Sequence, residues 1–174
     1  MVGDLRDTVQ GAQSGFEKLV GSIPGYKGYK ERELRREADK ILRAHQANRF
    51  DEQKRRLQGL MGQITSAGRW GELSPLEQAT LRMERLIDRL RTASYGYAGW
   101  FDAVKIEQQQ LDTLYEFDAN LASGVDRVAE VMSALEGLAA RGESTTAEVN
   151  ALLTLLQELN DTFGRRTDAV MGIA

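Results

Sequence analysis

The sequence predicts an all-α protein: an elongated antiparallel bundle of about five helices with coiled-coil-like packing and one very long second helix. Three observations predict this class. Charged residues make up 28 % of the 174 residues, and the chain contains only two prolines, Pro24 and Pro75. Hydrophobic residues also recur along most of the chain at steps of three and four, the spacing of one helix face. Because this length is about that of one domain, we expect residues 1–174 to form a single domain.

The composition limits the compartment and the chemistry. The chain contains no cysteine, which excludes disulfides, thiolate metal ligands and a cysteine nucleophile, and which fits a reducing compartment. Residues 1–20 carry acids and glutamines where a secretory signal needs a basic head and an apolar run. No apolar run approaches the roughly twenty residues that span a bilayer. We therefore expect a cytoplasmic protein, or one that is peripheral at a membrane.

The first two predicted helices meet at Pro24-Gly25. Residues 4–22 form the first helix, and the proline ends it because it cannot continue the hydrogen-bond ladder. The second helix is predicted from Gly28 to Trp70, on the order of 60 Å long, with Gly71 capping its end. Its narrow stripe comprises Leu34, Ala38, Ile41, His45, Leu57, Leu60 (or Met61) and Ile64.

The stripe of this second helix thins between His45 and Leu57. The segment Asn48-Arg49-Phe50-Asp51 contains residues that end one helix and cap another. Two helices that meet at Asn48 are therefore the alternative to a single continuous helix.

The third helix has a strong start signal in Ser74-Pro75-Leu76-Glu77. This segment combines an N-cap serine, proline at the first helical position and a glutamate three residues after the serine. The helix is expected to end near Ser94. Its stripe comprises Leu76, Ala79, Met83, Leu86 (with Ile87), Leu90 and Ala93.

Two further helices are predicted in the remaining chain. The fourth runs from Ile106 to Ala140 and ends at Arg141-Gly142, and the fifth opens with a second capping box, Thr145 to Glu148. Short turns make consecutive helices antiparallel neighbours, and the three-four alternation is typical of coiled coils. The fourth stripe comprises Leu111, Leu114, Phe117 (or Asp118), Leu121, Val125, Val128, Met132, Leu135 and Ala139. The fifth comprises Val149, Leu152, Leu156, Leu159, Phe163, Thr167 and Val170.

The net charge of -3 hides an uneven distribution. Residues 26–56 hold eleven Lys and Arg against six Asp and Glu, a balance of +5, whereas residues 107–174 hold four against twelve, a balance of -8. A basic helix and an acidic carboxyl-terminal half attract each other, within one molecule or between neighbouring copies. The alternative interpretation is two solvated faces of different composition.

No catalytic or metal-binding signature is visible. The only histidine, His45, has Leu42 three residues before it, so the Glu-x-x-His pattern of di-iron bundles is missing. The sequence also lacks G-x-S-x-G, P-loop and G-x-G-x-x-G motifs. A lone histidine on the inner stripe of a helix is most often a packed core residue. We expect a protein that is not an enzyme and that has no catalytic residue, metal or cofactor.

Nucleic acid is not an expected partner either. Clustered Lys and Arg on a helix are the electrostatic footprint of phosphate contacts. In residues 31–39, however, acidic residues are interleaved with the basic ones. Several of these acids lie three or four residues from a base, where pairs form on a solvated helix face.

Two glycine-aromatic segments, residues 24–30 and 95–101, lie at predicted helix junctions. If the helices alternate in direction, these junctions lie at the same end of the bundle. The aromatic residues then either cap the core, with hydroxyl and indole groups toward water, or form an end that binds a partner protein or a membrane interface. The candidate interaction surface comprises Tyr26, Lys27, Tyr29, Lys30, Tyr95, Tyr97, Trp100 and Phe101.

Residues 23–43, which read IPGYKGYKERELRREADKILR, resemble a segment of an uncharacterised prokaryotic family of all-helical proteins. The resemblance covers this segment alone. It implies a helical fold and no established activity, so no functional residue is carried over from it.

These observations favour a non-enzymatic structural or adaptor protein that self-associates and makes protein–protein contacts through its helix faces and aromatic end. The first alternative is a peripheral membrane-associated scaffold or stress protein that binds anionic lipid. The second is a small-ligand carrier with a pocket between its helices. The expected partner is therefore protein, either another copy or a larger assembly, with a membrane surface as the alternative.

Overall fold

The computed structural model describes residues 32–93 and 108–171, and this part of the chain is helical without strands. It contains four α-helices and one short 3₁₀ helix. The elements are α2 (Arg32–Ser66), η1 (Trp70–Glu72), α3 (Leu73–Thr92), α5 (Gln108–Ala140) and α6 (Thr146–Met171). The predicted helix over residues 4–22 lies outside the described residues.

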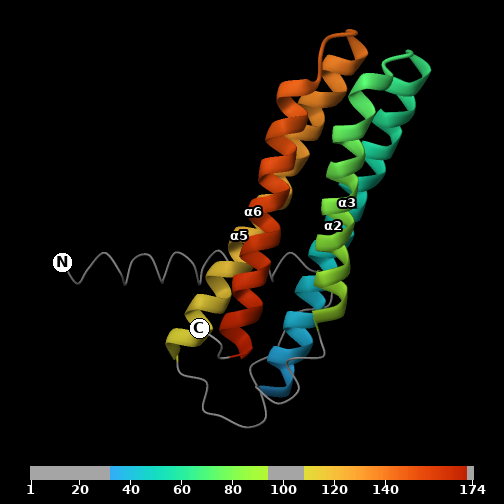
Figure 1. Cartoon of the computed structure of the whole chain (residues 1–174). Helices are drawn as coiled ribbons and strands as arrows, with labels where there is room; N and C mark the ends of the chain where they lie inside the picture. The colour runs from blue at the N-terminus through green and yellow to red at the C-terminus, as the bar shows by residue number, and fades with distance from the viewer. Residues whose placement is uncertain (1–31, 94–107, 172–174) are drawn as a thin grey trace, which may run out of the picture.

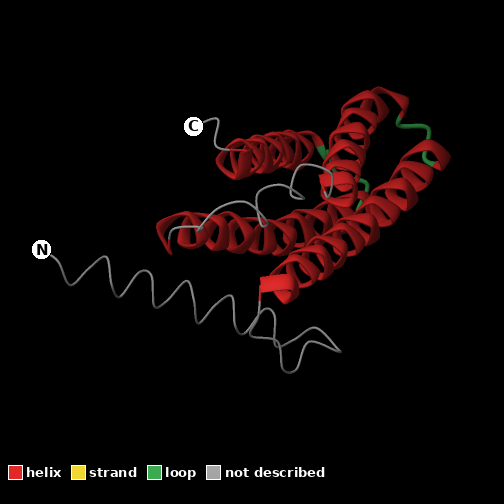
Figure 2. Ribbon diagram, turned by 90° about the horizontal axis from the view of Figure 1, so that it is seen from below, coloured by secondary structure: helices red, strands yellow, loops and turns green. Residues whose placement is uncertain are grey.

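The four helices form two antiparallel hairpins that pack against each other (Figure 1). We call α2, η1 and α3 the first hairpin, and α5 and α6 the second hairpin. Their two turns lie at the same end of the molecule, which we call the closed end (Figures 1 and 2). Because α2 packs on α5 and α3 packs on α6, α3 and α5 occupy diagonal corners of the bundle.

Helix α2 is continuous through Asn48, which settles the alternative left open by the sequence. Phe50 is fully buried and anchors this region in the core. The buried row of α2 comprises Leu42, Gln46, Phe50, Gln53, Leu57, Leu60 and Ile64. Two glutamines occupy inward positions in this row, so a stripe of hydrophobic residues alone looks thin there. The predicted stripe was wrong at Ile41 and His45, which are only half-buried, because the buried row runs one residue later.

Both hairpin turns start from glycines in the left-handed region. Gly68 has a φ of 72° and Gly142 a φ of 70°. The turn after α2 is closed by the Gly68 N–H donating to the Thr65 carbonyl and the next N–H donating to the Ile64 carbonyl. The turn after α5 repeats this pattern, which is the Schellman motif. The predicted end at Arg141-Gly142 is confirmed, whereas the predicted cap at Gly71 is wrong because α2 ends earlier, at Ser66.

The start of α3 differs from the predicted capping box. Glu72 occupies the N-cap position and Ser74 already lies inside the helix, because η1 runs directly into α3. Pro75 is tolerated there because the first four N–H groups of a helix have no partner within it. The predicted start of α6 is correct, since the Val149 N–H donates to the Thr145 carbonyl at 2.9 Å.

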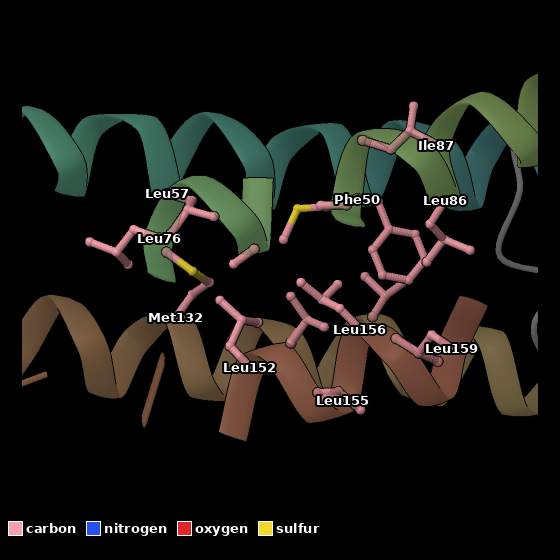
Figure 3. Packing of buried hydrophobic residues seen from close by; sticks show 14 of the residues in the cluster. Phe50, Leu57, Leu76, Leu86, Ile87, Met132, Leu152, Leu155, Leu156 and Leu159 are labelled. Atoms are coloured by element: carbon pink, nitrogen blue, oxygen red, sulfur yellow. The ribbon is translucent and has the colours of Figure 1, made fainter. Parts of the chain in front are cut away.

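The core is a layer of aliphatic side chains between the two hairpins (Figure 3). Phe50 and Leu86 from the first hairpin face Leu156 and Leu159 from the second. Each large apolar side chain that is fully buried contributes about 1.5–3 kcal/mol. The predicted stripes of α3 and α6 are reproduced by the buried positions Leu76, Ala79, Met83, Leu86, Leu90, Val149, Leu152, Leu156, Leu159 and Phe163. The buried positions that match the predicted stripe of α5 are Leu121, Val125, Val128, Met132 and Leu135.

Candidate functional site: the interface between two oppositely charged hairpins

The two hairpins carry opposite charges. Residues 32–93 hold fourteen Lys and Arg against nine Asp and Glu, a balance of +5. Residues 108–171 hold four Lys and Arg against eleven Asp and Glu, a balance of -7. Within the molecule, the two oppositely charged hairpins pack against each other, so the predicted attraction has a contact surface at the hairpin interface.

On the α2–α5 side, two arginines of α2 reach acidic residues of α5. Arg49 Nη2 lies 2.5 Å from Asp126 Oδ1. Arg56 binds Glu136 in a bidentate way, with N–O distances of 2.9 and 2.7 Å, and also donates to the Ser133 hydroxyl. The hydrogen bond from Arg56 lowers the pKa of Glu136 and, in turn, raises the pKa of Arg56.

On the α3–α6 side, two arginines of α3 donate to backbone carbonyls of α6. Arg82 Nη1 lies 2.7 Å from the Leu153 carbonyl oxygen, and Arg89 Nη1 lies 2.7 Å from the Asn160 carbonyl oxygen. The Asn160 amide returns a bond of 3.1 Å to the Arg82 carbonyl. Donors and acceptors are each seven residues apart, so the same contact repeats after two helical turns.

The guanidinium of Arg89 also covers an aromatic ring. Its Cζ lies 5.0 Å from the centre of the Phe163 ring on α6, within the range of a cation–π contact. Burial lowers the pKa of Arg89, but an arginine remains charged at any physiological pH. The Arg89 side chain therefore packs on the Phe163 ring and donates to the Asn160 carbonyl at the same time.

At the closed end, a polar clasp joins the two turns. Arg69 holds Glu72 in a bidentate pair at 2.6 and 2.7 Å and donates to the Glu143 carbonyl. The Thr145 hydroxyl donates to Glu72 Oε2 at 2.5 Å, so it binds the other hairpin in addition to opening α6. The hydrogen bond from Arg69 is the largest of several causes that lower the pKa of Glu72.

The arginine contacts between the hairpins share one direction. The five arginines that bridge the hairpins in the described residues all lie on the first hairpin, and their acceptors all lie on the second. The donors are Arg49, Arg56, Arg69, Arg82 and Arg89. Consequently, the first hairpin presents a row of cationic donors to the second hairpin, which carries the opposite net charge.

A buried polar layer lies toward the opposite end of the bundle. Arg166 of α6 and Asp118 of α5 form an ion pair at 2.6 Å, and both side chains are at most 3 % exposed. The Gln46 amide nitrogen donates to the Asp118 carbonyl at 3.1 Å, whereas its Oε1 is buried without a hydrogen-bond partner in the described part of the chain. Arg43, also buried, donates to the Leu90 carbonyl at 3.0 Å.

The sequence reasoning missed most of this layer. It allowed Asp118 as an alternative to Phe117 but did not place Arg43, Gln46 or Arg166 inside. A polar residue at a buried position of a helix has no hydrophobic signal. A useful signal was the heptad itself, because Arg166 continues the three-four alternation of α6.

The predicted aromatic surface lies outside the described residues. This applies to Tyr26, Lys27, Tyr29, Lys30, Tyr95, Tyr97, Trp100 and Phe101. The structure does describe an exposed aromatic residue that was not predicted as a contact: Trp70, in η1 at the closed end, is 64 % exposed.

Within the described residues, no group of three or more His, Asp or Glu side chains is arranged to hold a metal ion. No helix in the same part of the chain is long and apolar enough to cross a membrane. No family model, curated protein or solved structure matches the chain.

We predict that removing one partner of the buried ion pair costs far more than removing both. Asp118→Ala removes the carboxylate that pairs with the buried Arg166 guanidinium and is expected to lower the unfolding free energy by about 3–5 kcal/mol. The double variant Asp118→Leu with Arg166→Met is expected to recover most of this loss. Urea denaturation followed by circular dichroism measures both. Equal losses in the single and double variants would contradict the ion-pair account.

We also predict that acid weakens the hairpin interface. The pKa values of Glu72 and Glu136 are lowered in the folded protein, so the folded state binds fewer protons than the unfolded state as the pH falls. Their contribution is present above the ordinary glutamate pKa, about 4.3, and is lost below it. The unfolding free energy should therefore decrease between about pH 5 and pH 3, and less steeply in a Glu72→Gln, Glu136→Gln variant. An identical slope in both proteins would assign the acid effect to other carboxyl groups.

Proposed function

We propose that this chain is a non-enzymatic structural or adaptor protein that self-associates and makes protein–protein contacts through its helix faces and ends. The observation that carries the proposal is that the buried polar side chains form hydrogen bonds between helices. Arg43, Gln46, Asp118, Asn160 and Arg166 point inward and bond to other helices. Groups committed in this way hold helices in register, as an architectural protein requires.

The burial pattern also supports coiled-coil-like packing for the whole bundle. In α5 and α6 the buried rows alternate between steps of three and four over their described length. A fifth helix over residues 4–22, with a stripe at the same spacing, fits this plan as an additional element that needs a partner face.

Trp70 adds a second candidate contact to the aromatic end predicted from the sequence. Tryptophan is among the residues that contribute most to protein–protein binding, because its large ring fills a pocket on the partner. Arg69 and Glu72, which flank it in the sequence, are paired with each other, as are Arg141 and Glu143 in the other turn. The closed end therefore offers an exposed aromatic ring next to charges that already have partners.

We predict that the natively purified chain elutes as an oligomer or together with a protein partner, as measured by light scattering. A strict monomer with no accompanying protein would contradict the proposal.

We further predict that Trp70→Ala weakens binding of that partner by about 30-fold or more, the loss typical of a binding hot spot. Leu81→Ala is the matched control, because Leu81 is equally exposed at 64 % but lies along α3, away from the closed end. Circular dichroism should show unchanged helix content in both variants. An equal effect of the two substitutions would remove Trp70 from the proposed contact.

Flotation with anionic vesicles at low salt separates this proposal from the membrane-associated alternative. Protein that stays at the bottom of the gradient supports protein contacts, whereas salt-sensitive flotation would favour a scaffold on anionic lipid.

A further inference from the structure

The largest apolar surface of the described chain is the one between the hairpins. The core side chains come in two facing sets, with Phe50, Leu57 and Leu86 from the first hairpin and Met132, Leu152 and Leu156 from the second (Figure 3). The two sets pack against each other across the hairpin interface. If the hairpins of one molecule part, each one must find another hairpin to bury this face.

The outer surface offers much less to a second copy. In the described residues, the large hydrophobic side chains that are exposed are Trp70 and Leu81. The outward positions of α2 are small or polar instead, as at Asn48, Arg55 and Gly62. An association between outer faces would therefore bury little apolar area, whereas an association through the hairpin faces would bury the whole core.

Charge decides which hairpin can occupy that face. Two first hairpins would bring their bridging arginines together, and two second hairpins would bring their acidic residues together. The second hairpin supplies acidic acceptors for Arg49 and Arg56 of the first, and its balance of -7 is opposite to the +5 of the first hairpin. The occupant is therefore a second hairpin, from the same chain or from another copy.

The covalent connection allows either source. Residues 94–107 join the end of α3 to the start of α5, at diagonal corners of the bundle. Fourteen residues reach on the order of 45–50 Å when extended, which is several times the diameter of about 10 Å of one helix. The second hairpin can therefore dock on its own chain or on a neighbour.

We propose that two copies of this chain associate by exchanging second hairpins, so that α5 and α6 of one copy pack on α2 and α3 of the other. This exchange rests on the self-association proposed above and specifies which helices of the two copies pack together. Each half of the exchanged dimer retains the contacts that the described residues make between the hairpins, including the arginine contacts on the α2–α5 and α3–α6 sides and the clasp at Glu72. The protein concentration sets the balance between the closed monomer and the exchanged dimer.

The exchange is directly testable because the chain contains no cysteine, so a single introduced thiol is the only one in its chain. Arg49→Cys and Asp126→Cys place one thiol on each hairpin at a partly exposed ion pair, so each substitution alone costs little stability. The two single variants are unfolded together, refolded at high concentration and treated with a short bismaleimide. Exchange is expected to cross-link up to about half of the dimers, the share of mixed dimers that random pairing of two variants gives.

A matched control uses two positions within the second hairpin. Arg127→Cys and Glu158→Cys replace an exposed ion pair between α5 and α6. These helices stay together in both forms, so mixing these two single variants should give no cross-linked dimer. The double variant Arg49→Cys, Asp126→Cys should cross-link in any folded form and verifies that the two sites are within reach.

The possible outcomes separate this inference from the proposed function. Cross-linked dimers from the first mixture but not from the control mixture support the exchange. Dimers in light scattering that give no cross-link between chains would overturn the exchange and leave self-association standing. Monomers at every concentration would overturn both.

Discussion

The fold depends on the pairing of a basic helical hairpin with an acidic one. Each hairpin has its own glycine turn, and its apolar side chains pack against those of the other hairpin in one shared core. The core between Phe50 and Leu156 supplies most of the stabilisation, because each buried large side chain contributes about 1.5–3 kcal/mol. A partly exposed ion pair such as Arg49–Asp126 contributes about 0.2–1 kcal/mol. Apolar burial thus provides the stability, and the arginines favour contact between the basic hairpin and the acidic one.

The arginines and the buried polar layer align different pairs of helices. Arg82 and Arg89 repeat one contact at a seven-residue interval, and the Asn160 amide donates to the Arg82 carbonyl, so a shift of α3 along α6 by one turn would break this side-chain bond. The Asp118–Arg166 pair fixes α5 against α6 within the second hairpin. A buried charge tolerates no slip, because any other register leaves it without its partner. The layer therefore adds little net stability and defines the alignment.

The sequence was sufficient to predict the class, the turn at Gly142 and most buried positions, because hydrophobic spacing follows directly from helix geometry. It was insufficient wherever a polar residue faces inward. Gln46, Gln53 and Arg166 have no apolar signal, so α2 looked interrupted and the polar layer was not found. The Ser74 capping box failed for another reason: it is a local pattern, whereas Glu72 is held by Arg69 and by Thr145 from the other hairpin. The interface charges were visible in the count by segment, but individual pairs such as Arg56–Glu136 depend on the packing of distant helices.

The central claim is that neither hairpin is stable alone and that only opposite hairpins pair. Circular dichroism of two peptides, residues 32–93 and 108–171, tests it most directly when each is measured alone and both are measured as a mixture. The account predicts weak helicity in each peptide alone, a large increase on mixing, and a smaller increase at high salt because screening weakens the exposed ion pairs. Full helicity in either peptide alone, or equally strong pairing of two identical hairpins, would contradict it.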